Sequence, residues 1–237
     1  MIDMALREQV AQANADLVKA GLVTLSFGNV SGVDREADAL VIKPSGVACD
    51  QVRPEDLVVV SLVDGRVLEG TMRPSSDTPT HLRLYQAFPE LGGVVHTHSS
   101  FAAAFAQAGG DIPALGTTHA DHFRGPVPTT RLMTEAEIEG EYELETGNVI
   151  IETIRGRTDD ALRMPAALVR SHGPFTWGSD ADQAVVNAIA LEAVAAMAER
   201  TFSVNPEAPP MQEALLRRHF DRKHGPGAYY GQPGDEH

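Results

Sequence analysis

The stretch Gly93-Val94-Val95-His96-Thr97-His98 joins a buried type of strand to two side chains that commonly bind metals. Its valines are β-branched and apolar, which predicts a strand inside a sheet. Successive side chains of a strand point to opposite faces, so residues two apart share one face. We therefore expect the imidazoles of His96 and His98 to lie on one side of this strand, close enough to reach a single ion.

A second apolar run leads to the same residue type. Residues 166–171 predict another buried strand, and His172 follows directly, ahead of Gly173 and Pro174. Two strands that each end in histidine can bring three imidazoles together, and three protein ligands with an open position are typical of catalytic zinc sites. Spacing alone leaves a second interpretation open, because the chain has nine histidines and a His-x-His pair on a strand also arises by chance.

Periodic segments on both sides of this stretch predict an α/β domain in which helices flank a sheet. Strands are expected at 40–42 and 57–60, where β-branched residues precede turns rich in proline and glycine. Helical patterns lie at 6–17, at 78–87 with Thr78 as the N-cap, from a Thr134/Glu137 capping box, and at 180–200. We expect the whole chain, residues 1–237, to form one domain.

The composition limits the class of protein. The 237 residues suit one large domain, 43% of them are apolar, and no run of eighteen apolar residues predicts a membrane span. The net charge of −14 argues against a nucleic-acid partner, because phosphate backbones bind basic surfaces. The single cysteine, Cys49, and a start without a signal-peptide pattern predict a cytoplasmic protein that needs no membrane partner.

Three small polar loops are candidates for binding a phosphate. They cover residues 27–32, 43–46 and 74–79. Glycine and serine in such loops expose backbone N–H and hydroxyl donors, and the third loop meets the start of an expected helix. Taken one at a time, each loop is more simply an ordinary turn.

Taken together and in order, these segments resemble the class II aldolase family. The shared matches are Gly28-Asn29-Val30-Ser31, Lys43-Pro44-Ser45-Gly46-Val47, Ser75-Ser76-Asp77-Thr78-Pro79-Thr80-His81 and His96-Thr97-His98. Further matches resemble its branch of pentulose-phosphate 4-epimerases. They are Gly116-Thr117-Thr118-His119-Ala120-Asp121, Gly140-Glu141-Tyr142-Glu143, Glu145-Thr146-Gly147-Asn148-Val149-Ile150, Ser171-His172-Gly173-Pro174-Phe175, Lys223-His224-Gly225 and Tyr229-Tyr230-Gly231-Gln232.

The resemblance implies roles residue by residue. His96, His98 and His172 match the ligands of one divalent metal ion per subunit, usually zinc with manganese as the alternative, and Asp77 matches an acidic residue beside them. The positions that match substrate and phosphate contacts are Gly28, Asn29, Lys43, Ser45, Gly46, Ser75 and Ser76. The positions that match proton-transfer residues are Asp121 and Tyr230. Other positions expected near these groups are Thr117, Thr118, His219 and Arg222.

The resemblance also implies an architecture and an assembly. The expected fold is a three-layer α/β/α sandwich with a central, largely antiparallel sheet. The expected assembly is a homotetramer with active sites between subunits, in which a tail at about 205–237 reaches a neighbour. The implied substrate is a small sugar phosphate.

The implied reaction inverts C4 of a 2-ketose phosphate, and its chemistry explains why a metal is needed. A ketone at C2 acidifies the hydrogen on C3 and not the one on C4, so proton abstraction cannot invert C4. Retro-aldol cleavage of C3–C4, rotation of the glycolaldehyde phosphate and re-addition to a metal-bound enediolate would do so. A nicotinamide route lacks a G-x-G-x-x-G motif, and a Schiff-base route has only three lysines to draw on, of which Lys43 lies beside a Pro-Ser-Gly loop.

Two other functions remain open at this stage. An aldolase of the same family would release its fragments, although a glutamate is expected there in place of Asp77. A non-enzymatic interaction protein is also possible, since the adducin head shares the fold, but such a domain has no need of three ligands. The sequence assigns neither the metal nor the pathway, whether arabinose, ascorbate or another pentose route.

Overall fold

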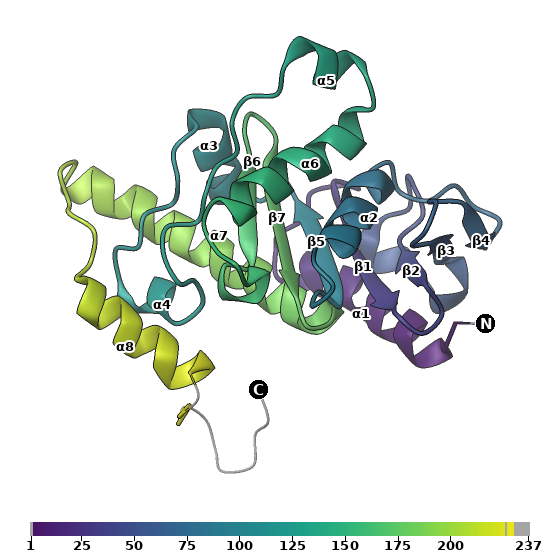
Figure 1. Cartoon of the computed structure of the whole chain (residues 1–237), viewed down its shortest axis with the longest axis horizontal. Coiled ribbons are helices and arrows are strands. Elements are labelled where there is room, and N and C mark those ends of the chain that lie inside the picture. The colour runs from purple at the N-terminus through teal and green to yellow at the C-terminus, as the bar shows by residue number, and fades with distance from the viewer. Residues whose placement is uncertain (1, 226, 230–237) are drawn as a thin grey trace.

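One antiparallel sheet organises the computed structural model, which describes residues 2–225 and 227–229 (Figure 1). Within those residues the sheet has seven strands in the order β4-β3-β2-β1-β5-β7-β6, and each neighbouring pair is antiparallel. The strands are β1 (Gly28–Asp34), β2 (Ala39–Ile42), β3 (Val58–Ser61), β4 (Val67–Glu69), β5 (Gly93–Thr97), β6 (Ala166–Val169) and β7 (Gly173–Gly178). The predicted antiparallel α/β fold is confirmed, and the stretch that begins at Gly93 forms β5 in the interior of the sheet.

Helices cover both faces of the sheet and complete three layers (Figure 1). They are α1 (Met4–Lys19), α2 (Thr78–Ala87), α3 (Ser100–Ala108), α4 (Thr117–Ala120), α5 (Glu135–Glu139), α6 (Tyr142–Arg155), α7 (Ala181–Val204) and α8 (Glu213–His224). Short 3-10 turns lie at Cys49–Gln51, Pro54–Asp56 and Ala161–Arg163.

Alternation along the strands divides the core into two apolar clusters. Val94 packs with Leu84 of α2 and Ile150 of α6, whereas Val95 packs with Val10 of α1. Adjacent strand residues face opposite sides, so an apolar run such as this one feeds both faces of the sheet. Helix α7 contributes to both clusters and runs behind β7 (Figure 1).

The prediction of a loop at residues 27–32 is wrong, because Gly28 begins strand β1. This strand pairs with β2 on one side and β5 on the other. Gly32 lies so close to α1 that a Cβ atom there would meet side-chain carbons of Val10 and Leu6 at 2.8 and 2.9 Å. The small residues that suggest a loop are therefore needed for close packing of a helix on the strand.

Two predicted boundaries of strands and helices lie at other residues in the structure. The strand expected at 166–171 ends at Val169, and Ser171 adopts φ 60°, which turns the chain into the β6–β7 hairpin. The N-cap of α2 is Asp77, one residue before the predicted Thr78. The Thr134/Glu137 capping box is confirmed, since Thr134 Oγ1 accepts from the backbone N–H of Glu137 and a Glu137 carboxylate oxygen accepts from Thr134.

Helix α7 is the longest apolar segment among the described helices. By length and composition it is apolar enough to cross a membrane, yet 56% of its most apolar stretch is buried inside the protein. A core helix packed on both sides meets the same criteria, because it too is apolar nearly all round. The feature is therefore explained by the position of α7 against the sheet.

Candidate metal centre

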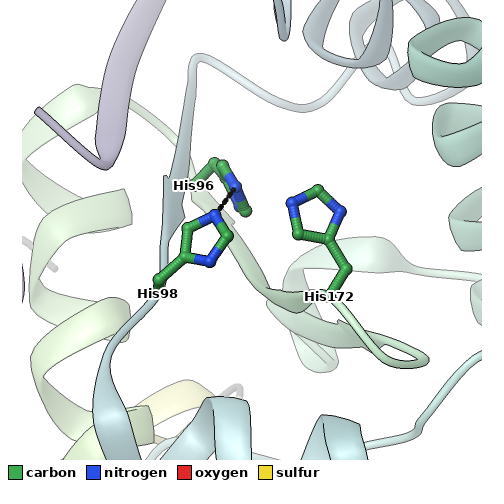
Figure 2. A group of neighbouring side chains, drawn as sticks. All are labelled: His96, His98 and His172. Atoms are coloured by element: carbon green, nitrogen blue, oxygen red, sulfur yellow. Dashed lines mark hydrogen bonds between the residues drawn. The ribbon is translucent and has the colours of Figure 1, made fainter.

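Three histidines, one on strand β5, one just after it and one in the β6–β7 turn, lie close together (Figure 2). His96 belongs to β5, His98 follows that strand, and His172 lies in the turn between β6 and β7. Strand β5 pairs with β7, and His96 lies opposite Phe175. The sheet register therefore brings the turn that carries His172 next to the end of β5.

The distances between the rings suit a shared metal ion. One candidate ligand atom from each histidine lies within 4.8 Å of the others, and His96 Nε2 lies 3.1 Å from His98 Nε2. Two imidazole nitrogens bound to one tetrahedral ion at about 2.1 Å are about 3.4 Å apart. The three rings face a common space (Figure 2), so their arrangement fits a divalent metal.

The environment of His96 fixes which ring nitrogen is available. Its Nδ1 lies 3.0 Å from the carbonyl oxygen of Pro174, which can only accept, so Nδ1 carries the proton and Nε2 has a free lone pair. The ring stacks on Phe175 with 4.2 Å between centroids and 17° between planes. Burial lowers the pKa of His96 to about 3, so the ring is neutral near pH 7, as a metal ligand must be.

Asp77 stands beside this group at the start of α2. Its carboxylate accepts a hydrogen bond of 2.6 Å from the amide of Asn29. Burial acts to raise the pKa of Asp77, but His96, His81 and the Asn29 hydrogen bond together lower it. The carboxylate is not part of the cluster formed by the three histidines among the described residues, so its role as a fourth ligand stays a prediction.

The predicted phosphate loops lie together beside Asp77. Pro44 and Pro74 form an isolated β-bridge, and the N–H of Ser75 donates to the carbonyl of Lys43 at 2.9 Å. Ser75 Oγ accepts from the Asn29 amide at 3.2 Å. Hydrogen bonds thus join three segments, which are β1, the loop after β2 and the loop before α2. Ser45, Gly46 and Ser76 are exposed, and Gly28 is buried.

Two buried polar groups in these segments lack strong partners among the described residues. Lys43 is 2% exposed, and its ammonium donates to the carbonyl of the adjacent Pro44 at 3.3 Å. Burial lowers the pKa of Lys43. Asn29 Oδ1 is buried and accepts no hydrogen bond. Because Ser75 bonds to both segments, a buried ammonium and a free acceptor on them suit a hydroxylated anion.

The predicted proton-transfer residue Asp121 lies between α4 and α8, and not in the segments that carry the three histidines. It caps α4 and receives hydrogen bonds from α8, at 3.1 Å from His219 Nδ1 and at 3.1 and 2.7 Å from Arg222. Among the described residues, no hydrogen bond or ion pair joins Asp121 to the three histidines. Thr117 and Thr118 are exposed on α4, and Tyr230 lies outside the described residues.

Two further residues, Tyr142 and His81, lie next to this group, the first against His172 and the second against Phe175, on which His96 stacks. Tyr142 Oη lies 3.2 Å from His172 Nδ1, and the buried His81 lies edge-on to Phe175 with its Nε2 unbonded. Both occur in motifs that carry the family resemblance, and these motifs are the sequence feature from which the two residues could be predicted. Nothing in their spacing indicates a contact with a residue so far away in the chain.

The sequence pattern of the "Class II Aldolase and Adducin N-terminal domain" family matches residues 8–198. The chain belongs to this family. The matched range runs from within α1 to most of α7, so it includes all three histidines and Asp77. It ends before α8, which therefore lies outside the part common to the family.

Members and structures of the class II aldolase family extend the likeness over nearly the whole chain. The L-ribulose-5-phosphate 4-epimerase UlaF of Salmonella paratyphi B (strain ATCC BAA-1250 / SPB7) is 57% identical over 227 residues, which are 96% of this chain and 98% of that protein. The protein of the same name from Salmonella typhi is also 57% identical over 227 residues. A solved L-fuculose 1-phosphate aldolase matches 94% of this chain and 97% of its own, with a TM-score of 0.74 and 20% identity. At that identity the aldolase supports the fold alone.

Proposed function

We propose that this chain is a metal-dependent L-ribulose-5-phosphate 4-epimerase, an isomerase that interconverts L-ribulose 5-phosphate and D-xylulose 5-phosphate. One observation carries the proposal: a relative of that name is 57% identical over almost the full length of both chains. The cluster of His96, His98 and His172 supports the metal dependence, because three imidazoles with converging nitrogens are a set that zinc favours. We propose zinc as the ion, with manganese as the alternative.

The metal and the polar residues around Asn29, Lys43 and Ser75 have separate roles in the chemistry. A bound divalent ion would supply Lewis-acid stabilisation of the negative charge that develops when C3–C4 breaks. The chain itself holds the substrate. Lys43 and the hydroxyls of Ser45, Ser75 and Ser76 anchor the phosphate, while the buried oxygen of Asn29 accepts from a substrate hydroxyl. A fixed phosphate lets the aldehyde fragment turn over without leaving.

Inversion at C4 needs proton transfer on both faces of the aldehyde carbonyl. We assign this to Asp121 and Tyr230. Arg222 and His219 hold the Asp121 carboxylate, and these contacts keep it ionised and able to accept the proton of the C4 hydroxyl. Thr117 and Thr118 lie on the helix that Asp121 caps.

The position of Asp121 supports an assembly with sites between subunits. The described part of the tail packs on its own chain, since Leu216 of α8 contacts Ala114 and Ala120, and the N–H of Met211 donates to the carbonyl of Ala114. Asp121 is thus held between α4 and α8, and the histidine cluster lies elsewhere in the same chain. We propose a cytoplasmic homotetramer of single-domain chains in which the end of the tail, with Tyr230, completes a neighbour's site.

A coupled assay tests the function directly. Purified protein is given L-ribulose 5-phosphate, and formation of D-xylulose 5-phosphate is followed before and after treatment with a chelator and re-addition of zinc. We expect turnover that the chelator abolishes and zinc restores. Full activity in metal-stripped protein would contradict the proposal. Steady accumulation of glycolaldehyde phosphate and dihydroxyacetone would instead identify an aldolase.

A further inference from the structure

Tyr142 lies against His172, the histidine of the cluster that comes from a turn between two strands. His172 is in the β6–β7 turn, directly after Ser171 with its positive φ of 60°. The Tyr142 hydroxyl lies 3.2 Å from His172 Nδ1, and the two rings are 28° from parallel with centroids 6.2 Å apart. The phenol therefore contacts His172 both through its hydroxyl and through its ring face.

The backbone of Tyr142 is held firmly enough to fix that contact. Tyr142 begins α6, and its carbonyl accepts from Thr146 Oγ1 at 2.8 Å. Helix α6 packs tightly on α2, because a Cβ atom on Gly147 would lie 2.7 Å from the Cβ of Arg83. Thr80 Oγ1 of α2 donates to the carbonyl of Glu143. The helix pair that presents Asp77 to the cluster therefore also presents Tyr142.

The hydrogen bond decides which nitrogen of His172 is free. An imidazole that binds a metal through Nε2 keeps its proton on Nδ1, and that N–H needs an acceptor. For His96 the acceptor is the carbonyl of Pro174. For His172 the described group within hydrogen-bond distance of Nδ1 is the Tyr142 oxygen. With Nδ1–H donating to this oxygen, the Nε2 lone pair is available to the ion.

We propose that Tyr142 is a positioning residue that accepts a hydrogen bond from His172 Nδ1–H, holds His172 as an Nε2 ligand and thereby raises the affinity of the site for its divalent ion. The inference rests on the metal site of the proposed function. It assigns a physical role to the Gly140–Glu143 motif, which the phosphate and proton-transfer assignments leave without one.

Zinc binding without substrate tests this role. The dissociation constant of zinc is measured by competition with a chromophoric chelator for the full chain, for Tyr142→Phe and for Thr153→Val. Tyr142→Phe keeps the ring and removes the hydroxyl, so we expect zinc to bind about 10- to 100-fold more weakly. Thr153→Val removes a hydroxyl of the same helix that donates to the carbonyl of Val149 and not to Tyr142, so its affinity should equal that of the unmodified chain.

Unchanged zinc affinity in Tyr142→Phe, or an equal loss in Thr153→Val, would overturn the inference. A measurement on the unmodified chain covers the case in which a variant fails to fold. The ¹⁵N chemical shifts of His172 in zinc-loaded protein should identify a protonated Nδ1 and a metal-bound Nε2, and the reverse pattern would overturn the inference. A Tyr142 effect in a protein that does not convert L-ribulose 5-phosphate would support the inference and contradict the proposed function.

Discussion

The histidine cluster and the Asp121 cluster, which consists of Asp121, His219 and Arg222, are held in place by different kinds of contact. His96 lies on an interior strand, and the sheet register sets the positions of the groups around it. Asp121 is the C-cap of the short helix α4, which lies beside α8 (Figure 1), and His219 and Arg222 of α8 orient its carboxylate. The metal ligands are thus fixed by the core, whereas the proton-transfer group is fixed by side chains from a helix at the periphery.

Their electrostatics differ in the same sense. Burial lowers the pKa of His96, so that the imidazole is neutral and can bind a cation. Burial acts to raise the pKa of Asp121, but hydrogen bonds from Arg222 and His219 outweigh it and lower the pKa, so the carboxylate stays charged. The comparison suggests that damage to the first cluster should remove the ion, and damage to the second should leave the ion bound and slow proton transfer.

The largest effect is expected from His98→Ala. Loss of one of three ligands should abolish stoichiometric zinc binding and lower kcat/KM at least about 10⁴-fold, or roughly 5.5 kcal/mol. Zinc content by elemental analysis and the coupled assay measure the two quantities. His122→Ala, which removes an imidazole outside the cluster, should keep its zinc. A His98→Ala protein with full zinc content would show that the histidine cluster does not hold the ion.

Asp121→Asn should separate the two regions most clearly. The amide retains the shape of the carboxylate but accepts no proton, so kcat should fall about 10³-fold while zinc content stays at that of the unmodified chain. The measurement pairs steady-state kinetics with metal analysis on the same sample. Loss of zinc in this variant would mean that the two clusters are not independent.

Arg222→Gln should give a smaller effect with a distinctive pH dependence. Arg222 binds both carboxylate oxygens of Asp121, and its loss should lower kcat about 10-fold, in line with roughly 1.4 kcal/mol for a charge-assisted hydrogen bond. The pKa of Asp121 then rises, so the acid limb of the kcat profile should move to higher pH. Arg222→Lys keeps the charge without the two-pronged geometry and should shift the limb less. An unmoved limb in Arg222→Gln would argue against this role.

Mild acid should weaken the metal-free protein slightly. Burial lowers the pKa of His81 to about 4 and that of His96 to about 3, from an ordinary value of 6.5. Below pH 6.5 the unfolded chain binds protons that the folded chain does not, so stability is full above that pH and is lost as the pH falls toward 4. Between pH 7.5 and 6.0 the free energy of unfolding should drop by an amount on the order of 1 kcal/mol. Urea titrations at the two pH values measure this free energy. Equal or greater stability at pH 6.0 would contradict the lowered pKa values of His81 and His96.

The same contrast explains how much could be read from the sequence. Strand alternation predicts that His96 and His98 share a face, because the rule is local. The prediction from local composition fails at Gly28. Glycine and serine there indicate a loop, but pairing with distant strands makes the segment strand β1. The contacts of His172 with Tyr142 and of Asp121 with Arg222 join segments far apart in the chain, and no local pattern encodes them. The role of Tyr230, which lies outside the described residues, remains a prediction.

The place of β5 in the sheet has a consequence for how the protein assembles. This strand pairs with β1, from the start of the chain, and with β7, from its last third. Contacts between segments so distant in sequence form late, because each closes a long loop of chain. A polypeptide still emerging from the ribosome can carry His96 and His98 but has no His172 beside them. Binding of the ion by all three ligands must therefore follow the pairing of β5 with β7, so a metal-loaded chain is one in which these two strands have already paired.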